Sequence, residues 1–147
     1  MWIDYSKKID IKNLNIIFNT DNQLPSLGSN TIVNMGQTHS NNVNFIEGNS
    51  KIYQSTDALF TSNKNIALEI KVADCMPIFL FDKKSSFFGA IHAGWRGLAD
   101  GVIENSIELL KEKHFELSDT EVFIGPSISQ KNFEVQSDVM SYFDSKF

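Results

Sequence analysis

The sequence predicts a strand-rich α+β fold, and two observations support this prediction. Short apolar runs separated by polar turns fill most of the chain before residue 94. Apolar residues at helical spacing occur only from residue 98 onward and again near the end of the chain. Strands and helices are therefore segregated along the sequence, which is typical of α+β proteins and differs from repeated βαβ units.

The strands are predicted from compact apolar runs and from alternation with a period of two. The clearest alternation runs from Ile66 to Val72, in a strand predicted to end at Cys75. Residues 76–81 and 86–93 flank the polar turn DKKSS, which indicates a hairpin of buried strands. Further strands are expected at 14–18, 31–37, 43–46, 57–61 and 121–125, with a loop at 21–30.

Two helices are predicted from the spacing of apolar side chains. The first begins at Leu98 and has acidic residues early and Lys113 and His114 late, as the helix dipole favours. His114 is therefore interpreted as a surface residue and not as a ligand. The second helix is predicted to begin with Ser137 as its cap and to continue to Phe147, with an apolar face that another element or subunit must cover.

Length and composition limit the class of protein. The 147 residues suit a single domain, 1–147, and 41% hydrophobic and 12% aromatic residues are typical of a folded chain. A net charge of -5 with scattered lysines gives no basic surface for nucleic acid. No window reaches about 18 apolar residues, and the N-terminus lacks the apolar core of a signal peptide. We therefore expect a cytoplasmic protein without a membrane segment.

The side chains most able to perform chemistry are three histidines, one cysteine and one arginine. His39, Cys75 and His92 are each predicted where a strand gives way to a turn. A cysteine with two histidines is a competent zinc set that leaves a fourth position for water or substrate. The alternative is a buried cysteine and two polar turn residues, because separations of 36 and 17 residues match no local metal motif.

The stretch AGWRG contains the single arginine of the chain, Arg96. Its two glycines permit a close backbone approach or a sharp turn before the helix at Leu98, whose first N–H groups would face an anion. A guanidinium holds phosphate or carboxylate in a bidentate manner, which lysine does poorly. The alternative is a structural ion pair of Arg96 with Asp74 or Asp57, with Trp95 packed in the core.

Five motifs follow one another in an order and spacing that resemble those of one family: GQTHSNNV, STDALFT, VADCMPIFLFD, GAIHAGWRGL and IGPSISQKNFEVQSDV. This family is variously called laccase-domain, polyphenol oxidase-like or purine nucleoside phosphorylase-like, and its members are also described as peptidoglycan-editing factors. The resemblance extends from about Asn34 to about Val139 and covers the greater part of the chain.

The resemblance implies both a fold and an activity. The fold it implies is a layered α/β/β/α sandwich similar to that of Cys-His hydrolases and deamidating toxins. The matching positions imply that His39, Cys75 and His92 bind zinc as the cofactor. The implied activity is zinc-dependent phosphorolysis of purine nucleosides (adenosine, inosine and methylthioadenosine), with adenosine deaminase activity alongside. The expected partners are therefore a purine nucleoside and phosphate, and homo-oligomer formation is left open.

Within this hypothesis the site residues have separate roles. Zinc positions phosphate or polarises water, while Arg96 neutralises the anion. Asp74 or Asp57 orients a ligand or donates a proton. The predicted catalytic residues are Cys75, His92, Arg96 and Asp74. The predicted substrate and phosphate contacts are Arg96, Gln37 and Gly94.

Two departures from the family pattern leave alternatives open. The chain has IFNTDNQLPS where many relatives have a T-R-x-G-G-like loop, and it ends at Phe147 where relatives continue, so we expect it to lack their C-terminal part. One alternative is a metal-free or metal-assisted amide hydrolase acting on a peptidoglycan precursor, with Cys75 as nucleophile and His92 as base. Another is a truncated, inactive relative. Multicopper oxidation is excluded, because three histidines cannot supply several copper sites.

Overall fold

The computed structural model describes residues 1–6, 14–21, 30–48, 50–84 and 86–145. Strands dominate and the helices come late, so the α+β prediction is confirmed. In chain order the elements are β1 (Trp2–Asp4), β2 (Ile17–Asn19), β3 (Thr31–Gly36), β4 (Val43–Phe45), β5 (Ile52–Gln54), β6 (Ala58–Thr61), β7 (Ile66–Glu69), β8 (Met76–Asp82), β9 (Phe88–Ala93), α1 (Trp95–Ala99), α2 (Val102–Glu112), β10 (Thr120–Ile124), the 3-10 turn η2 (Gln130–Asn132) and α3 (Ser137–Asp144).

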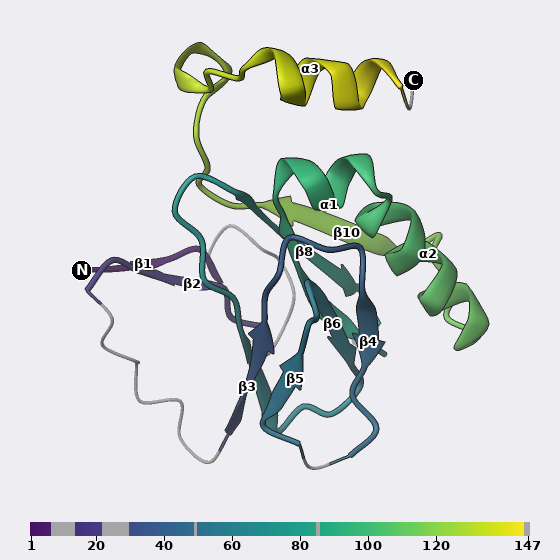
Figure 1. Cartoon of the computed structure of the whole chain (residues 1–147). Coiled ribbons are helices and arrows are strands. Elements are labelled where there is room, and N and C mark those ends of the chain that lie inside the picture. Colours follow the sequence, from purple (N-terminus) through teal and green to yellow (C-terminus); the bar gives the residue numbers. More distant parts are fainter. Residues whose placement is uncertain (7–13, 22–29, 49, 85, 146–147) are drawn as a thin grey trace.

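The described strands form three sheets, whose arrangement is visible in Figure 1. The largest has five strands in the order β10-β8-β9-β6-β4, and a second has the order β5-β3-β7. β1 and β2 form a separate antiparallel pair. β4 runs parallel to β6, and β3 runs parallel to both of its neighbours, whereas the other pairs of the large sheet are antiparallel.

The five-stranded sheet is buried on both faces because successive residues of its central strands point to opposite sides. Phe60 belongs to an apolar cluster with Leu110 of α2. Its neighbour Leu59 belongs to a different cluster with Val33 of β3. A third cluster, around Phe81, lies beneath the β1–β2 pair. The helices, the large sheet and the small sheet therefore form successive layers. This packing holds in place the strand ends that build the site.

Most of the predicted strands are confirmed, namely those at 31–37, 43–46, 57–61 and 121–125 and the hairpin of 76–81 with 86–93. The strand predicted to reach Cys75 ends earlier, at Glu69, because among the described strands β7 pairs only with β3 and their register ends at Asn34 opposite Glu69. Cys75 instead lies directly before β8. The strand expected at 14–18 is shifted to Ile17–Asn19, and the loop at 21–30 lies almost wholly outside the described residues.

The long helix predicted from Leu98 is divided into α1 and α2. Gly101 lies between them with φ of 90°, a left-handed conformation that interrupts the helix. α1 begins at Trp95, and the backbone N–H of Leu98 donates to the carbonyl of Gly94 at 2.9 Å. The prediction that the helix begins at Leu98 is therefore wrong, whereas the predicted contact of its first N–H groups with an anion stays a prediction.

α3 lies apart from the sheets and packs over α1 (Figure 1). The ring of Trp95 contacts Tyr142 at a centroid distance of 5.6 Å and Phe143 at 6.3 Å. The expectation that Ser137 caps this helix is wrong, since Gln136 occupies the cap position without a side-chain hydrogen bond. No helix in the described part of the chain has the length and apolar content to span a bilayer.

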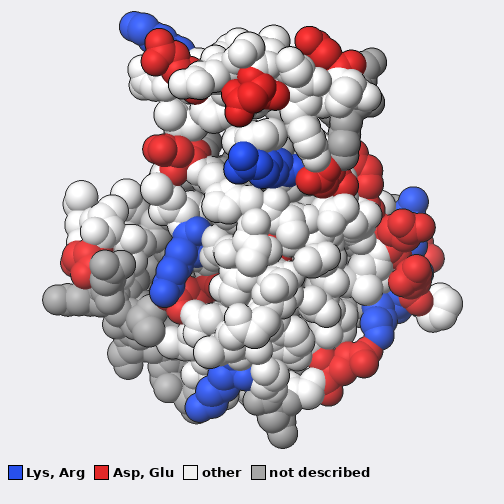
Figure 2. All heavy atoms as spheres, viewed as in Figure 1, with Lys and Arg blue, Asp and Glu red and all other residues white. Residues whose placement is uncertain are grey.

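Charged side chains of both signs are scattered over the face of the molecule in Figure 2. The basic groups on this face are separated from one another by acidic or uncharged groups. This face therefore has no continuous basic surface of the kind that binds nucleic acid.

Candidate metal centre

The hairpin of β8 and β9 brings Cys75 and His92 together. In its register Pro77 lies opposite His92 and Met76 lies opposite Ala93, so Cys75 is next to the end of β9. The His92 side chain is only 3% exposed, whereas Cys75 is half-buried. Two adjacent strands thus fix both side chains at one edge of the large sheet.

His39 reaches the same place from the turn that follows β3. Its side chain is exposed, and its φ of 57° puts its backbone in the left-handed region, which is uncommon for residues other than glycine. Its ring lies edge-on to the ring of His92, with centroids 4.8 Å apart and an interplanar angle of 70°. The turn therefore directs this third side chain at the end of the β8–β9 hairpin.

The ligand atoms of His39, Cys75 and His92 all lie within 4.8 Å of one another. Zinc binds imidazole nitrogen at about 2.0–2.1 Å and thiolate sulfur at about 2.3 Å, so the ligands of one tetrahedral ion are roughly 3.5 Å apart. A small contraction of this cluster would therefore accommodate the ion. Two imidazoles and one thiolate also suit copper, so the donor set defines a transition-metal site and the choice of metal needs chemical analysis.

Gly94 lies directly against His39 and Cys75 of the cluster. A Cβ placed on this residue would lie 2.7 Å from His39 Cδ2 and 3.2 Å from Cys75 Sγ. The absence of a side chain is therefore what allows two of the three candidate ligands to approach the backbone between β9 and α1. Gly94 was predicted as a substrate contact, and the structure puts it against the candidate metal ligands.

Asp57 is fully buried behind the two histidines. Its Oδ1 lies 2.8 Å from His92 Nδ1 and accepts a hydrogen bond from the His39 backbone N–H at 3.0 Å. Its Oδ2 accepts from the backbone N–H groups of Thr38 at 3.1 Å and Ser40 at 2.8 Å, and from Ser40 Oγ at 2.7 Å. Burial opposes ionisation, but these hydrogen bonds outweigh it and hold the pKa of the Asp57 carboxyl below its usual value.

The surroundings of Cys75 disfavour a free thiolate. Burial raises the pKa of its thiol, and the negative charges of Asp74 and Asp57 raise the pKa further. The same carboxylates favour a cation at this place. The electrostatics therefore suit a metal-bound sulfur better than an uncompensated nucleophilic thiolate.

Two further predicted site residues, Asp74 and Arg96, lie outside this three-residue cluster. Asp74 is exposed and precedes Cys75. Arg96 is exposed, with its guanidinium 4.3 Å from the centre of the Trp95 ring. Asp57 is engaged by His92 and the turn, so it is not the ion-pair partner considered for Arg96.

Both ends of the Gln37 side-chain amide form hydrogen bonds with the backbone of one residue, Lys71. Its Nε2 donates to the carbonyl of Lys71 at 2.7 Å, and its Oε1 accepts from the Lys71 N–H at 2.8 Å. This pair ties the end of β3 to the loop that leads to Cys75. The predicted contact of Gln37 with phosphate stays a prediction.

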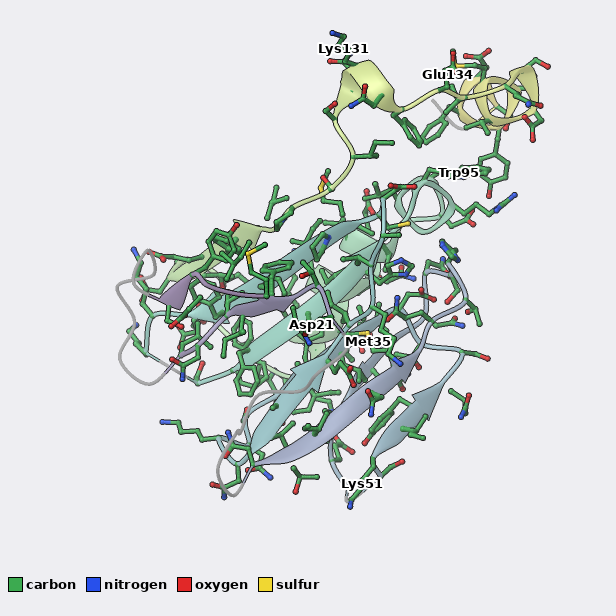
Figure 3. The ribbon with its side chains drawn as sticks, turned by 90° about the vertical axis from the view of Figure 1, so that its left-hand side faces the viewer. Asp21, Met35, Lys51, Trp95, Lys131 and Glu134 are labelled. Atoms are coloured by element: carbon green, nitrogen blue, oxygen red, sulfur yellow. The ribbon has the colours of Figure 1, made fainter. Side chains whose placement is uncertain are left out.

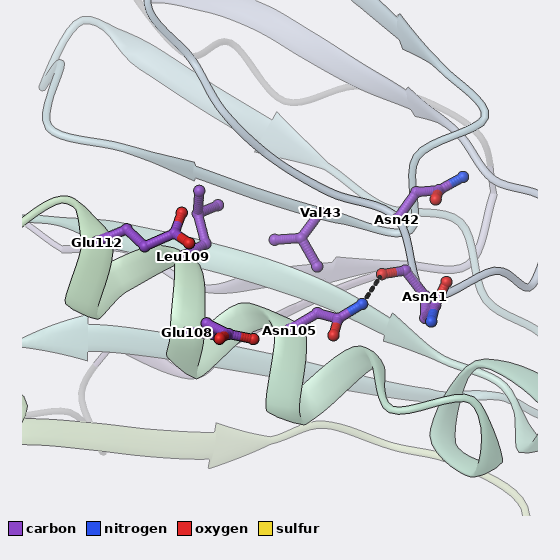
Figure 4. A pocket seen from close by; sticks show the side chains of 7 residues that line it. All are labelled: Asn41, Asn42, Val43, Asn105, Glu108, Leu109 and Glu112. Atoms are coloured by element: carbon purple, nitrogen blue, oxygen red, sulfur yellow. Dashed lines mark hydrogen bonds between the residues drawn. The ribbon is translucent and has the colours of Figure 1, made fainter.

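Sequence reasoning missed the part that Thr38 and Ser40 play in holding the His39 turn. It also missed Asn41, whose Nδ2 donates to the carbonyl of Asp100 at 2.7 Å and whose carbonyl accepts from Asn105 at 2.9 Å. Figure 4 shows the contact between Asn105 and Asn41 beside a hollow between α2 and β4. The signal available in the sequence was the polar run THSNN itself, since side chains of this kind hydrogen-bond turns locally.

The fold and the cluster define a layered α+β protein with a candidate two-histidine, one-cysteine metal centre. Residues 11–147 match the family described as "Multi-copper polyphenol oxidoreductase laccase", and the chain belongs to this family. The resemblance inferred from the five motifs is thereby confirmed.

Curated relatives carry a more specific name. The protein "Purine nucleoside phosphorylase SSP1584" of Staphylococcus saprophyticus is 36% identical over 118 residues, which are 74% of this chain and 44% of that protein. "Purine nucleoside phosphorylase SACOL1200" of Staphylococcus aureus is 36% identical over 89 residues, 60% of this chain and 32% of that protein. The chain thus spans less than half the length of these relatives.

Solved structures agree with the fold. YlmD from Geobacillus stearothermophilus superposes with a TM-score of 0.73 at 26% identity, covering 82% of this chain and 48% of that one. The Neisseria meningitidis protein NMB0706 gives a TM-score of 0.66 at 30% identity, covering 79% of this chain and 47% of that one. These similarities support the layered arrangement described above.

Proposed function

We propose that this chain carries the zinc site of a purine nucleoside phosphorylase acting on adenosine, inosine or methylthioadenosine, with adenosine deaminase activity alongside. The observation that carries the proposal is the convergence of His39, Cys75 and His92 within 4.8 Å. The names of the curated relatives support the substrate class. In this reaction a phosphate oxygen bonds to the anomeric carbon of the ribose, the bond to the purine nitrogen breaks, and the purine leaves with a proton.

Zinc, when bound, would supply a Lewis acid beside the reacting groups. His39, Cys75 and His92 would hold it, and a three-ligand set keeps one position open. Asp57 fixes the orientation of His92 from behind, and Gly94 leaves room for the ligands. Copper remains a chemical alternative for the donor set, but three histidines cannot build the several copper centres of a multicopper oxidase.

The residues around the cluster supply charge of both signs. Arg96 is exposed on the helix that follows Gly94, where its guanidinium would bind phosphate. Asp74 is an exposed carboxylate next to Cys75, and we propose it as the group that moves the proton to the leaving purine. Gln37 would act on this site through the Lys71 loop that precedes Cys75.

A second candidate is an amide hydrolase with Cys75 as nucleophile. It is favoured by the pairing of His92 Nδ1 with Asp57 Oδ1 at 2.8 Å, because cysteine hydrolases also use a base oriented by a third group. It is disfavoured by the raised pKa of Cys75, which works against a thiolate in the absence of a cation. Phosphorolysis with a metal therefore ranks first.

Metal analysis coupled to a phosphate-dependent assay tests the proposal. The wild-type protein should contain zinc near one equivalent and release free purine base from adenosine or inosine only when phosphate is present. Cys75→Ala should lose both zinc and turnover. Copper in place of zinc, or release of the purine base that is independent of phosphate, would contradict the proposal. Metal-free protein that is inactivated by a thiol reagent would instead favour the amide hydrolase.

A further inference from the structure

We infer that Asp57 is the positioning residue that prepares both histidines of the metal centre. The inference rests on the metal site of the proposed function and not on its nucleoside chemistry. Asp57 touches no candidate substrate position, because its side chain is fully buried. Its two carboxylate oxygens face His92 on one side and the backbone of the His39 turn on the other.

Asp57 determines which nitrogen of His92 is available. An ionised carboxylate only accepts hydrogen bonds, so the His92 Nδ1 that lies 2.8 Å from Asp57 Oδ1 must carry the proton. Whenever the ring is neutral, its lone pair is then on Nε2, which is the form that binds a metal. The backbone reinforces the alignment, since the His92 N–H donates to the Asp57 carbonyl at 2.7 Å.

Asp57 also holds the turn that presents His39. Three consecutive backbone N–H groups, those of Thr38, His39 and Ser40, donate to its carboxylate at 3.1, 3.0 and 2.8 Å. They converge because His39 has a φ of 57°, a conformation that its side chain disfavours. A turn of successive N–H groups around an anion is a favourable arrangement, so the carboxylate offsets the backbone strain at the ligand.

The hydrogen-bond donors around Asp57 require both of its carboxylate oxygens to act as acceptors. In Asp57→Asn one oxygen becomes an NH₂ donor of nearly the same size. That donor must face either His92 Nδ1 or the N–H groups of Thr38 and Ser40. In the first case His92 is driven to the tautomer protonated on Nε2, and in the second case the turn that carries His39 loses its acceptor.

Imidazole ¹⁵N chemical shifts of the metal-free protein test the His92 side directly. In wild type, at a pH where the His92 ring carries a single proton, His92 should show a protonated, pyrrole-type Nδ1 and an unprotonated, pyridine-type Nε2. In Asp57→Asn the two shifts should exchange when the new NH₂ group faces His92 Nδ1, and they should stay when that group faces the His39 turn. Affinity for zinc, measured by competition with a chromophoric chelator, should fall about 10- to 100-fold. The cobalt-substituted protein should keep its thiolate charge-transfer band while its d–d bands change.

Asp82→Asn is the matched control. Asp82 is also a buried carboxylate that accepts from a turn, through Ser86 N at 3.0 Å and Ser86 Oγ at 2.6 Å, but it lies at the opposite end of β8. This variant should leave the His92 shifts and the zinc affinity unchanged. A destabilised fold alone would not reproduce the Asp57→Asn result.

A His92 ring protonated on Nε2 alone in the wild-type metal-free protein would overturn the inference, even if Asp57→Asn failed to fold. Unchanged zinc affinity in a folded Asp57→Asn protein would overturn it as well. These measurements need neither phosphate nor nucleoside. If they succeed while the phosphorolysis assay fails, the role of Asp57 stands and the proposed reaction is wrong.

Discussion

Gly94 lies directly against the ring of His39, so that a Cβ on Gly94 would stand 2.7 Å from His39 Cδ2. The backbone of Gly94 has φ of -75° and ψ of 160°, which any residue adopts. Space, and not conformation, is therefore what requires glycine at this position. The consequence is a substitution that acts on the candidate metal ligands while leaving the backbone unstrained.

Gly94→Ala should weaken metal binding without unfolding the protein. The added methyl group pushes on the His39 ring and touches Cys75 Sγ, and the exposed His39 side chain moves aside. We expect zinc affinity to fall by about tenfold or more, while the thermal midpoint of the metal-free protein changes little. Chelator competition and thermal unfolding measure the two effects separately.

Gly48→Ala is the control for this substitution, because a Cβ there meets nothing within 4 Å. It should leave both zinc affinity and thermal midpoint unchanged. Equal zinc affinity in Gly94→Ala and Gly48→Ala would show that the ligands do not bind a metal over Gly94.

Much of the fold could be predicted because its buried strands are compact apolar runs. β8 and β9 flank a polar turn, so their pairing was expected, and the pairing itself puts Cys75 beside the end of β9. β1 and β5 have three residues each, which is too short to show a period of two. The division of α1 from α2 depends on the positive φ of Gly101, and a glycine in a helical pattern does not reveal by itself whether it is tolerated or breaks the helix.

The site was less accessible to sequence reasoning than the fold. His39, Cys75 and His92 were candidates by residue type, but their separations match no local motif. Asp57 was one of two possible orienting carboxylates, and its partners come from segments 17 to 35 residues away. Only the pairing of β6 with β9, in which Ala58 lies opposite Ile91, brings Asp57 to His92. Contacts of this kind are set by sheet register, which the sequence alone left open.

Arg96→Lys should raise the KM for phosphate about tenfold while leaving the KM for the nucleoside and the zinc content unchanged. Lysine keeps the positive charge, but it loses the bidentate geometry and the planar contact with Trp95, where the guanidinium lies 4.3 Å from the ring centre. Steady-state kinetics with varied phosphate measure the effect. Lys131→Gln removes an exposed positive charge on η2, which lies away from Trp95 in Figure 3, and should not change the KM for phosphate. An unchanged KM in Arg96→Lys would remove Arg96 from the anion site.

Asp82 should make the β8–β9 hairpin sensitive to acid. Burial opposes its ionisation, but hydrogen bonds from Ser86 and Lys84 and the charge of Lys84 hold its pKa below the usual value of 3.8. A lowered folded pKa contributes stability that is fully present above the unfolded pKa and is lost as pH falls through the folded pKa. The free energy of unfolding of the wild type should therefore decrease below about pH 4.

Asp82→Asn should lose about 1–2 kcal/mol at neutral pH and show a weaker acid dependence than the wild type. Urea unfolding at several pH values between 3 and 7 measures both quantities. Parallel pH profiles of the two proteins would mean that Asp82 is not a source of the acid sensitivity.

Tyr142→Ala should detach α3 from α1 without disturbing the sheets. α3 contains no fully buried residue, and Tyr142 contacts the Trp95 ring edge-on and donates a hydrogen bond to Asp100 Oδ1. Loss of these contacts should speed amide hydrogen exchange in residues 137–144 and shift Trp95 fluorescence to longer wavelength, with Trp2 replaced by phenylalanine to isolate the signal. Met140→Ala, on the same helix at a side chain that is 52% exposed, should change neither quantity. Slow exchange retained in Tyr142→Ala would show that other contacts hold α3 against local opening.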